Sequence, residues 1–123
     1  MSDVGDLLDA ADRMLDDPAL TSGIWLRAAS LVYRAALEEA LSDFWVRRAN
    51  GLQHANGRAQ MACLREYAGE VLSREVSNAW GELSAMAHHR TELGPDPLAV
   101  RRAGQAVRAA VAGLMGTGGR NAS

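Results

Sequence analysis

The residues best suited to chemistry at neutral pH lie close together, between Trp80 and Pro95. This stretch reads as an amphipathic helix that ends in two adjacent imidazoles, His88 and His89, followed by the guanidinium of Arg90 and the carboxylate of Glu92. A Gly-Pro pair then predicts the end of the helix. Any hypothesis about a reaction therefore starts from this cluster.

The spacing of these groups suits general acid–base catalysis. Glu92 follows His88 by four residues and His89 by three, so on a continuous helix its carboxylate can pair with either imidazole. The helix dipole and the carboxylate both favour a charged imidazole, and histidine is the side chain that exchanges protons near pH 7. The alternative interpretation is that these residues are ordinary partners of the helix C-terminus.

Two arginines are candidate substrate-binding residues, Arg90 within the cluster and Arg74 further back on the same helix. Arg74 shares a helical face with His88 but precedes it by 14 residues, which is roughly 21 Å at the rise of an α-helix. That distance is too long for one pocket within one chain, and a dimer would double the number of arginines at the pocket.

No metal or other cofactor is expected. Adjacent histidines point about 100° apart on a helix and rarely bind one ion together. Cys63 is the only cysteine and lies in an apolar run, which predicts a buried, inert thiol. The tryptophans fall on apolar faces, so core packing is their main interpretation and a stacking platform for bases is the alternative.

The composition favours a single all-α domain. The chain has 123 residues, 48% of them hydrophobic but only 5% aromatic, and the difference is largely alanine, the best helix former. The formal net charge is −2, which is not the overall signature of a nucleic-acid-binding domain. No apolar run is long enough to span a membrane and the N-terminal residues are acidic, so a soluble cytoplasmic protein is expected.

Periodicity and breaking residues predict four to five helices within residues 1–115 and a disordered tail over 116–123. The first helix is expected over 3–16, the second over 24–49, and a loop over 50–57. A third helix from 58 reaches Leu72 unless Gly69 splits it, and a fourth starts near Ser73. Asp96 caps a fifth helix that begins with a proline and runs to about Met115.

Three segments together resemble the HEPN superfamily of small helical domains: Arg58–Leu64, Trp80–Ser84 and Ala87–Leu93. The resemblance covers roughly residues 20 to 115. It implies an up-down helical bundle that forms a homodimer. It also implies a metal-independent ribonuclease of a toxin–antitoxin or phage-defence system, with an arginine four to six residues before a histidine in the pocket. No arginine occupies those positions before His88 or His89.

Two functions follow from these observations. In the first, His88 or His89 is the general acid or base that cleaves RNA, Arg90 holds the phosphate, and Glu92 orients an imidazole. In the second, the chain is a non-catalytic adaptor or antitoxin-like module that binds a cognate protein partner. Both are compatible with a homodimer, because the helices are rich in alanine and Gly81 lies on a helix face that a partner helix can approach.

Overall fold

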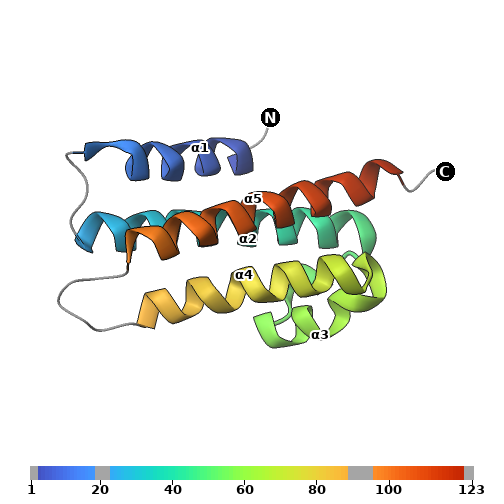
Figure 1. The fold of residues 1–123 in the computed structure, drawn as a ribbon. Coiled ribbons are helices and arrows are strands. Elements are labelled where there is room, and N and C mark those ends of the chain that lie inside the picture. Colours follow the sequence, from blue (N-terminus) through green and yellow to red (C-terminus); the bar gives the residue numbers. More distant parts are fainter. Residues whose placement is uncertain (1–2, 19–22, 89–95, 121–123) are drawn as a thin grey trace.

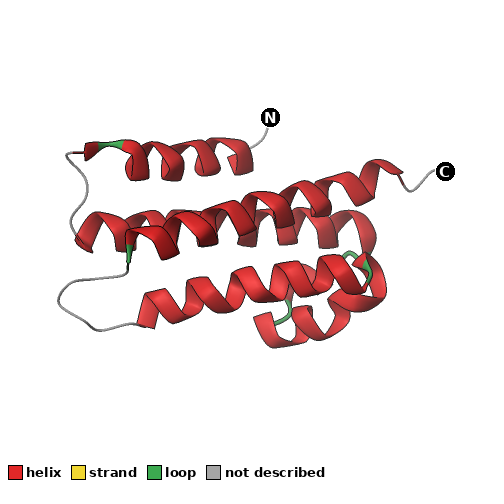
Figure 2. Ribbon diagram, viewed as in Figure 1, coloured by secondary structure: helices red, strands yellow, loops and turns green. Residues whose placement is uncertain are grey.

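The computed structural model describes residues 3–18, 23–88 and 96–120, with 87–88 and 117–120 described by their backbone alone. Within these residues the chain forms helices joined by short turns (Figure 2). The five α-helices are α1 (Asp3–Asp16), α2 (Gly23–Arg48), α3 (Gly57–Ala68), α4 (Glu70–His88) and α5 (Pro97–Arg120). A single turn of 3₁₀-helix, η2 (Leu52–His54), lies between α2 and α3. The predicted all-α bundle is confirmed.

The long helices α2 and α5 run in the same direction and pack against each other (Figure 1). Helix α1 packs along this pair on one side and α4 along the other, both in the opposite direction, while α3 folds back beside the start of α4. The core lies between the four long helices. Within the described part of the chain, no helix is both long and apolar enough to cross a membrane.

Helix α2 supplies the largest part of the core. Tyr33, Phe44 and Trp45 are among the largest side chains that are fully buried. Trp45 meets Phe44 edge to face at 5.1 Å between ring centroids and meets Tyr67 of α3 in the same way at 5.5 Å. Such edge-to-face pairs place the positive ring edge against the negative ring face, so α3 is held on the bundle by aromatic packing.

Capping side chains mark the starts of two helices, of which the sequence predicted the second. Asn56 accepts a hydrogen bond from the backbone N–H of Ala59 at 2.8 Å and opens α3. Asp96 accepts from the backbone N–H of Leu98 at 3.2 Å and opens α5, whose first residue is Pro97.

The sequence left open whether the third helix reaches Leu72 or is split at Gly69, and the structure shows the split. Helix α3 ends at Ala68, and Leu72 belongs to α4. Gly69 separates the helices with a φ of +88°, a conformation that is readily available only to glycine. Gly69 is therefore the break, and the two helices are distinct.

The end of α5 also differs from the prediction. The helix continues through Gly116 to Arg120, so the segment 116–120 of the expected disordered tail is helical, and 121–123 lie outside the described residues. Glycine costs a helix about 1 kcal/mol relative to alanine. It keeps its backbone N–H, however, and therefore weakens a helix without ending it as proline does.

Candidate functional site

The histidine cluster lies where the described part of the chain stops. His88 is the last residue of α4, and His89, Arg90 and Glu92 lie outside the described residues. The proposed pairing of Glu92 with an imidazole therefore stays a prediction. The helix does continue through the tryptophan segment to His88, as the periodicity predicted.

Arg74 lies near the opposite end of α4, where it is part of a local ion-pair group. Its Nη2 is 2.9 Å from Oε2 of Glu70, one turn earlier, and Arg65 of α3 reaches the other oxygen of the same carboxylate at 3.5 Å. The Arg74 side chain is 67% exposed. The guanidinium thus helps to hold the junction of α3 and α4, and the length of the helix separates it from His88.

A polar hollow between α2, α3 and α4 brings Trp80 together with residues that the sequence analysis did not single out. It has a volume of about 390 Å³ and is walled in part by Arg34, Glu38, Ser42 and Trp80. The guanidinium of Arg34 lies over the Trp80 ring at 5.1 Å from its centroid and 3.5 Å from the Glu38 carboxylate. The Cζ2 side of the indole lies against Gly57, where an added Cβ atom would be 3.4 Å from Cζ2. The Trp80 ring is therefore covered by its own chain, which leaves little surface for stacking a base.

Gln60 also lines this hollow, and three hydrogen bonds hold its side chain in place. Its Oε1 accepts a hydrogen bond from the indole N–H of Trp45 at 3.0 Å. Its amide nitrogen donates to the carbonyl oxygens of Ala55 at 2.8 Å and Gln53 at 3.3 Å. A buried indole N–H needs such an acceptor. Gln60 therefore fastens the 52–57 segment to the core.

A second polar network joins three helices through Tyr33. Its hydroxyl donates to Asp12 of α1, and Arg108 of α5 reaches Asp12 at 2.6 Å and Asp9 at 2.9 Å. Burial, followed by the hydrogen bond and negative charge of Asp12, raises the pKa of the Tyr33 phenol. The phenol therefore stays protonated at neutral pH, and the network has the properties of a structural clamp.

Ile24 and Leu31 recur at helical spacing with the other apolar residues of the second helix, but the bundle does not bury them. Ile24 is 77% exposed, Leu31 is 49% exposed and Val46 is 50% exposed. They lie on one side of α2, facing away from the core, in line with residues that are partly covered. We call this stripe the outer face of α2; its residues are Ile24, Ala28, Leu31, Ala35, Ser42 and Val46.

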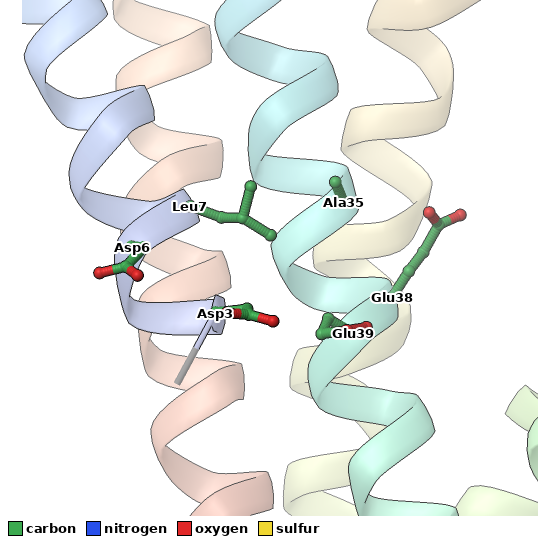
Figure 3. A pocket seen from close by; sticks show the side chains of 6 residues that line it. All are labelled: Asp3, Asp6, Leu7, Ala35, Glu38 and Glu39. Carbon is green, nitrogen blue, oxygen red and sulfur yellow. The ribbon is translucent and has the colours of Figure 1, made fainter. Parts of the chain in front are cut away.

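An open groove of about 600 Å³ runs between this face and α1 (Figure 3). Leu7 of α1 and Ala35 of α2 form its apolar part. Four carboxylates surround them, those of Asp3, Asp6, Glu38 and Glu39. The outer face of α2 therefore carries negative charge beside its middle.

The remaining predictions about aromatic and sulfur side chains are only partly correct. Trp45 is fully buried, whereas Trp25 is 43% exposed and Trp80 is partly buried against the core. Cys63 is also only partly buried. Among the described residues, no three His, Cys, Asp or Glu side chains are placed to hold a metal ion together.

Comparison of the chain with protein-family models, with curated proteins and with solved structures finds no match. The resemblance to the HEPN superfamily therefore stays a prediction that depends on the three sequence segments given above.

Proposed function

We propose that this chain is a non-catalytic helical interaction module that works in the cytoplasm by binding protein through the outer face of α2. One observation carries the proposal. Helix α2 buries apolar residues on the side that faces α5 and exposes Ile24, Leu31 and Val46 on the other side. A row of exposed aliphatic side chains on one face of a helix that is otherwise polar there is typical of a surface that binds a partner. A partner protein would provide the missing cover.

The size of the effect supports such a role. Burying one Val, Leu or Ile side chain contributes about 1.5–3 kcal/mol. Three large aliphatic side chains on one stripe therefore offer several kcal/mol to a partner, against the cost of association. Among the other side chains that the structure describes, exposed apolar residues such as Val71 on α4 do not continue into a stripe of this length.

The test compares two arginine substitutions. Leu31→Arg places a charge in the middle of the outer face, and Val71→Arg places the same charge at an equally accessible position on α4. The chain is co-expressed with the product of the neighbouring gene, and both hetero-association and self-association are measured by calorimetry and sedimentation. We expect Leu31→Arg to weaken association at least tenfold and Val71→Arg to leave it unchanged. Association that ignores Leu31→Arg would contradict the proposal.

A second candidate function is the HEPN-like ribonuclease. It is favoured by the continuation of α4 as a helix to His88, which puts an imidazole-bearing residue at a helix C-terminus. In this proposal His88 or His89 transfers the proton, Glu92 orients the imidazole, and Arg90 contacts the phosphate, with Arg74 supplied by a second copy. The biological setting would be a toxin–antitoxin or phage-defence system.

The ribonuclease candidate makes a separate prediction about activity. Cleavage of single-stranded RNA should proceed in the presence of a chelator and depend on pH near neutrality. His88→Ala or His89→Ala should abolish it, and Arg90→Ala should weaken it. The absence of cleavage of a diverse RNA pool by folded wild-type protein would leave the interaction module as the function.

A further inference from the structure

We infer that the groove between α1 and the outer face of α2 binds a basic amphipathic helix of another protein. The aliphatic side chains of that helix pack on Leu7, Leu31 and Ala35, and its lysine or arginine side chains lie beside the carboxylates of the groove. This inference rests on the proposed function, because it uses the same face of α2, and it adds the chemistry of the partner.

The carboxylates of α1 fall into two groups that differ in their partners. Asp9 and Asp12 face α5, where the guanidinium of Arg108 lies 2.9 Å and 2.6 Å from them. Asp3 and Asp6 line the groove instead, and no cation in the described part of the chain pairs with them. The chain therefore neutralises the carboxylates that lie beside α5 and leaves those of the groove to an external cation.

Helix α2 continues this negative charge across the groove (Figure 3). Glu39 is exposed and has no cationic partner among the described residues. Glu38 lies 3.5 Å from Arg34, whose guanidinium is over the ring of Trp80 on the α4 side of the helix. Of the described residues that line the groove, four are acidic and none is basic. Such a surface attracts a basic partner and repels an acidic one.

The apolar part of the groove favours a helix as the occupant. Its lining residues all belong to α1 and α2, so the groove has no strand edge to which an extended peptide could add. Leu7 points from α1 towards α2 beside Ala35 (Figure 3), and Leu31, one turn earlier on α2, is 49% exposed. A helix that lies in a groove is recognised through apolar side chains at three- and four-residue spacing, which matches this arrangement.

The length and the charge distribution of the partner follow from the same surface. Ile24 precedes Glu39 by fifteen residues, which is about 22 Å, or about four turns of an α-helix. The carboxylates gather around Ala35, whereas Arg13 and Arg27 lie further along the two antiparallel helices, towards Ile24. The basic residues of the partner therefore belong in the half that covers Glu39, and its other half is neutral.

The first experiment uses two designed peptides as probes. The basic probe is a helical peptide of about four turns with leucines at three- and four-residue spacing and lysines beside them in one half. The acidic probe has glutamate in place of each lysine. In NMR titrations of the isotope-labelled chain, the basic probe should shift the amide signals around Leu7, Ala35 and Glu39, and calorimetry should show that it binds at least tenfold more tightly than the acidic probe. Equal binding of both probes, or no binding at millimolar concentration, would overturn the inference.

Two pairs of substitutions then test whether the groove itself holds the lysines. Asp6→Asn with Glu39→Gln removes two carboxylates from the groove, and Glu75→Gln with Glu82→Gln removes two exposed carboxylates from α4. At the same ionic strength, the first pair should weaken binding of the basic probe at least tenfold and the second should leave it nearly unchanged. Circular dichroism checks that both variants are folded. Equal losses would mean that the probe follows the net charge of the chain, which contradicts a site in the groove.

A second copy of the chain is the alternative occupant of this face. Sedimentation of the wild-type chain without any probe detects it. Self-association that Leu31→Arg abolishes would show that the face is covered by its own copy, and would overturn the inference of a basic partner.

The failure of this inference can be told from the failure of the proposed function. The product of the neighbouring gene is measured against Leu31→Arg and against Asp6→Asn with Glu39→Gln. If only Leu31→Arg disrupts its binding, the interaction module stands and its partner is not held by the carboxylates of the groove. If neither that product nor the basic probe responds to Leu31→Arg, both proposals fail.

Discussion

The phenol ring of Tyr33 occupies the space that a side chain on Gly104 would fill. A Cβ atom at Gly104 would lie 2.4 Å from Cζ of Tyr33 and 2.6 Å from its hydroxyl oxygen. The ring cannot easily move away, because its hydroxyl donates to Asp12, which Arg108 also holds. The close approach of α2 and α5 therefore requires that position 104 has no side chain, as in glycine.

Gly104→Ala should destabilise the fold even though alanine is the better helix former. We expect a loss of about 1–3 kcal/mol in the free energy of unfolding, as is typical of overpacking a close-packed core. Gly81→Ala is the control, because a Cβ there meets nothing within 4 Å and should stabilise the helix by about 0.5–1 kcal/mol. Urea melts of both variants give the two signs. If both substitutions stabilised the protein equally, the Tyr33 ring would have to move aside to make room for the new Cβ atom.

The Tyr33 phenol should make stability fall at high pH. Its pKa is raised above the ordinary value of 10.0, first by burial and then by Asp12. Above pH 10 the unfolded chain loses this proton while the folded chain keeps it. The unfolded state then binds fewer protons, and stability decreases as pH rises. Urea melts between pH 8 and pH 11 should show a decline that is smaller in Tyr33→Phe. An identical decline in both proteins would remove Tyr33 as its cause.

Gln60→Leu should destabilise the fold, because it leaves the buried indole N–H of Trp45 without its hydrogen-bond acceptor. Leaving a buried donor without its acceptor costs about 1–3 kcal/mol. Gln60→Glu keeps an acceptor for Trp45 but cannot donate to the carbonyls of Ala55 and Gln53, so it separates the two parts of the contact. Hydrogen exchange of the Trp45 indole, followed by NMR, should be accelerated in Gln60→Leu and least affected in Gln60→Glu. Unchanged exchange in Gln60→Leu would mean that another group takes over.

Trp45→Ala and Trp80→Ala should differ in their effect on stability. Trp45 is fully buried, and truncation of such a residue costs about 3–5 kcal/mol. Trp80 is only partly buried and has Arg34 above its ring, so its loss should cost less, about 1–3 kcal/mol including a cation–π contact of about 1 kcal/mol. Denaturant melts measure both values. A larger loss at Trp80 would contradict the packing described.

Local chemistry made some parts of this fold readable from the sequence. The acidic first turn of α1 and the Asp96–Pro97 start of α5 are decided by neighbouring residues, so the local sequence predicts them. It also identified Gly69 as one of two possible breaks, which the structure decides. The end of α5 was missed because glycine weakens a helix without ending it. The sequence could not reveal the clamp between Tyr33, Asp12 and Arg108, since the partners are 21 and 96 residues apart.

The face of α2 shows a different limit. Periodicity identified its apolar residues but did not say which of them the rest of the chain covers, because Ile24 and Leu31 fit the same spacing as buried Leu26 and Tyr33. The direction of exposure is a property of the packed bundle. For the candidate histidine site, the sequence supplied the whole hypothesis, and within the described residues only the position of His88 at the end of α4 can be compared with it.

The link between Asp12 and Arg108 has a consequence for how the chain is made. Asp12 leaves the ribosome 96 residues before its partner, an interval of roughly 5–20 s at typical rates of synthesis. During that time α1 has no α5 against which to pack, and its apolar residues Val4, Leu8 and Ala11 lack part of their final cover. The nascent chain therefore passes through a period in which chaperones and proteases can reach its first helix.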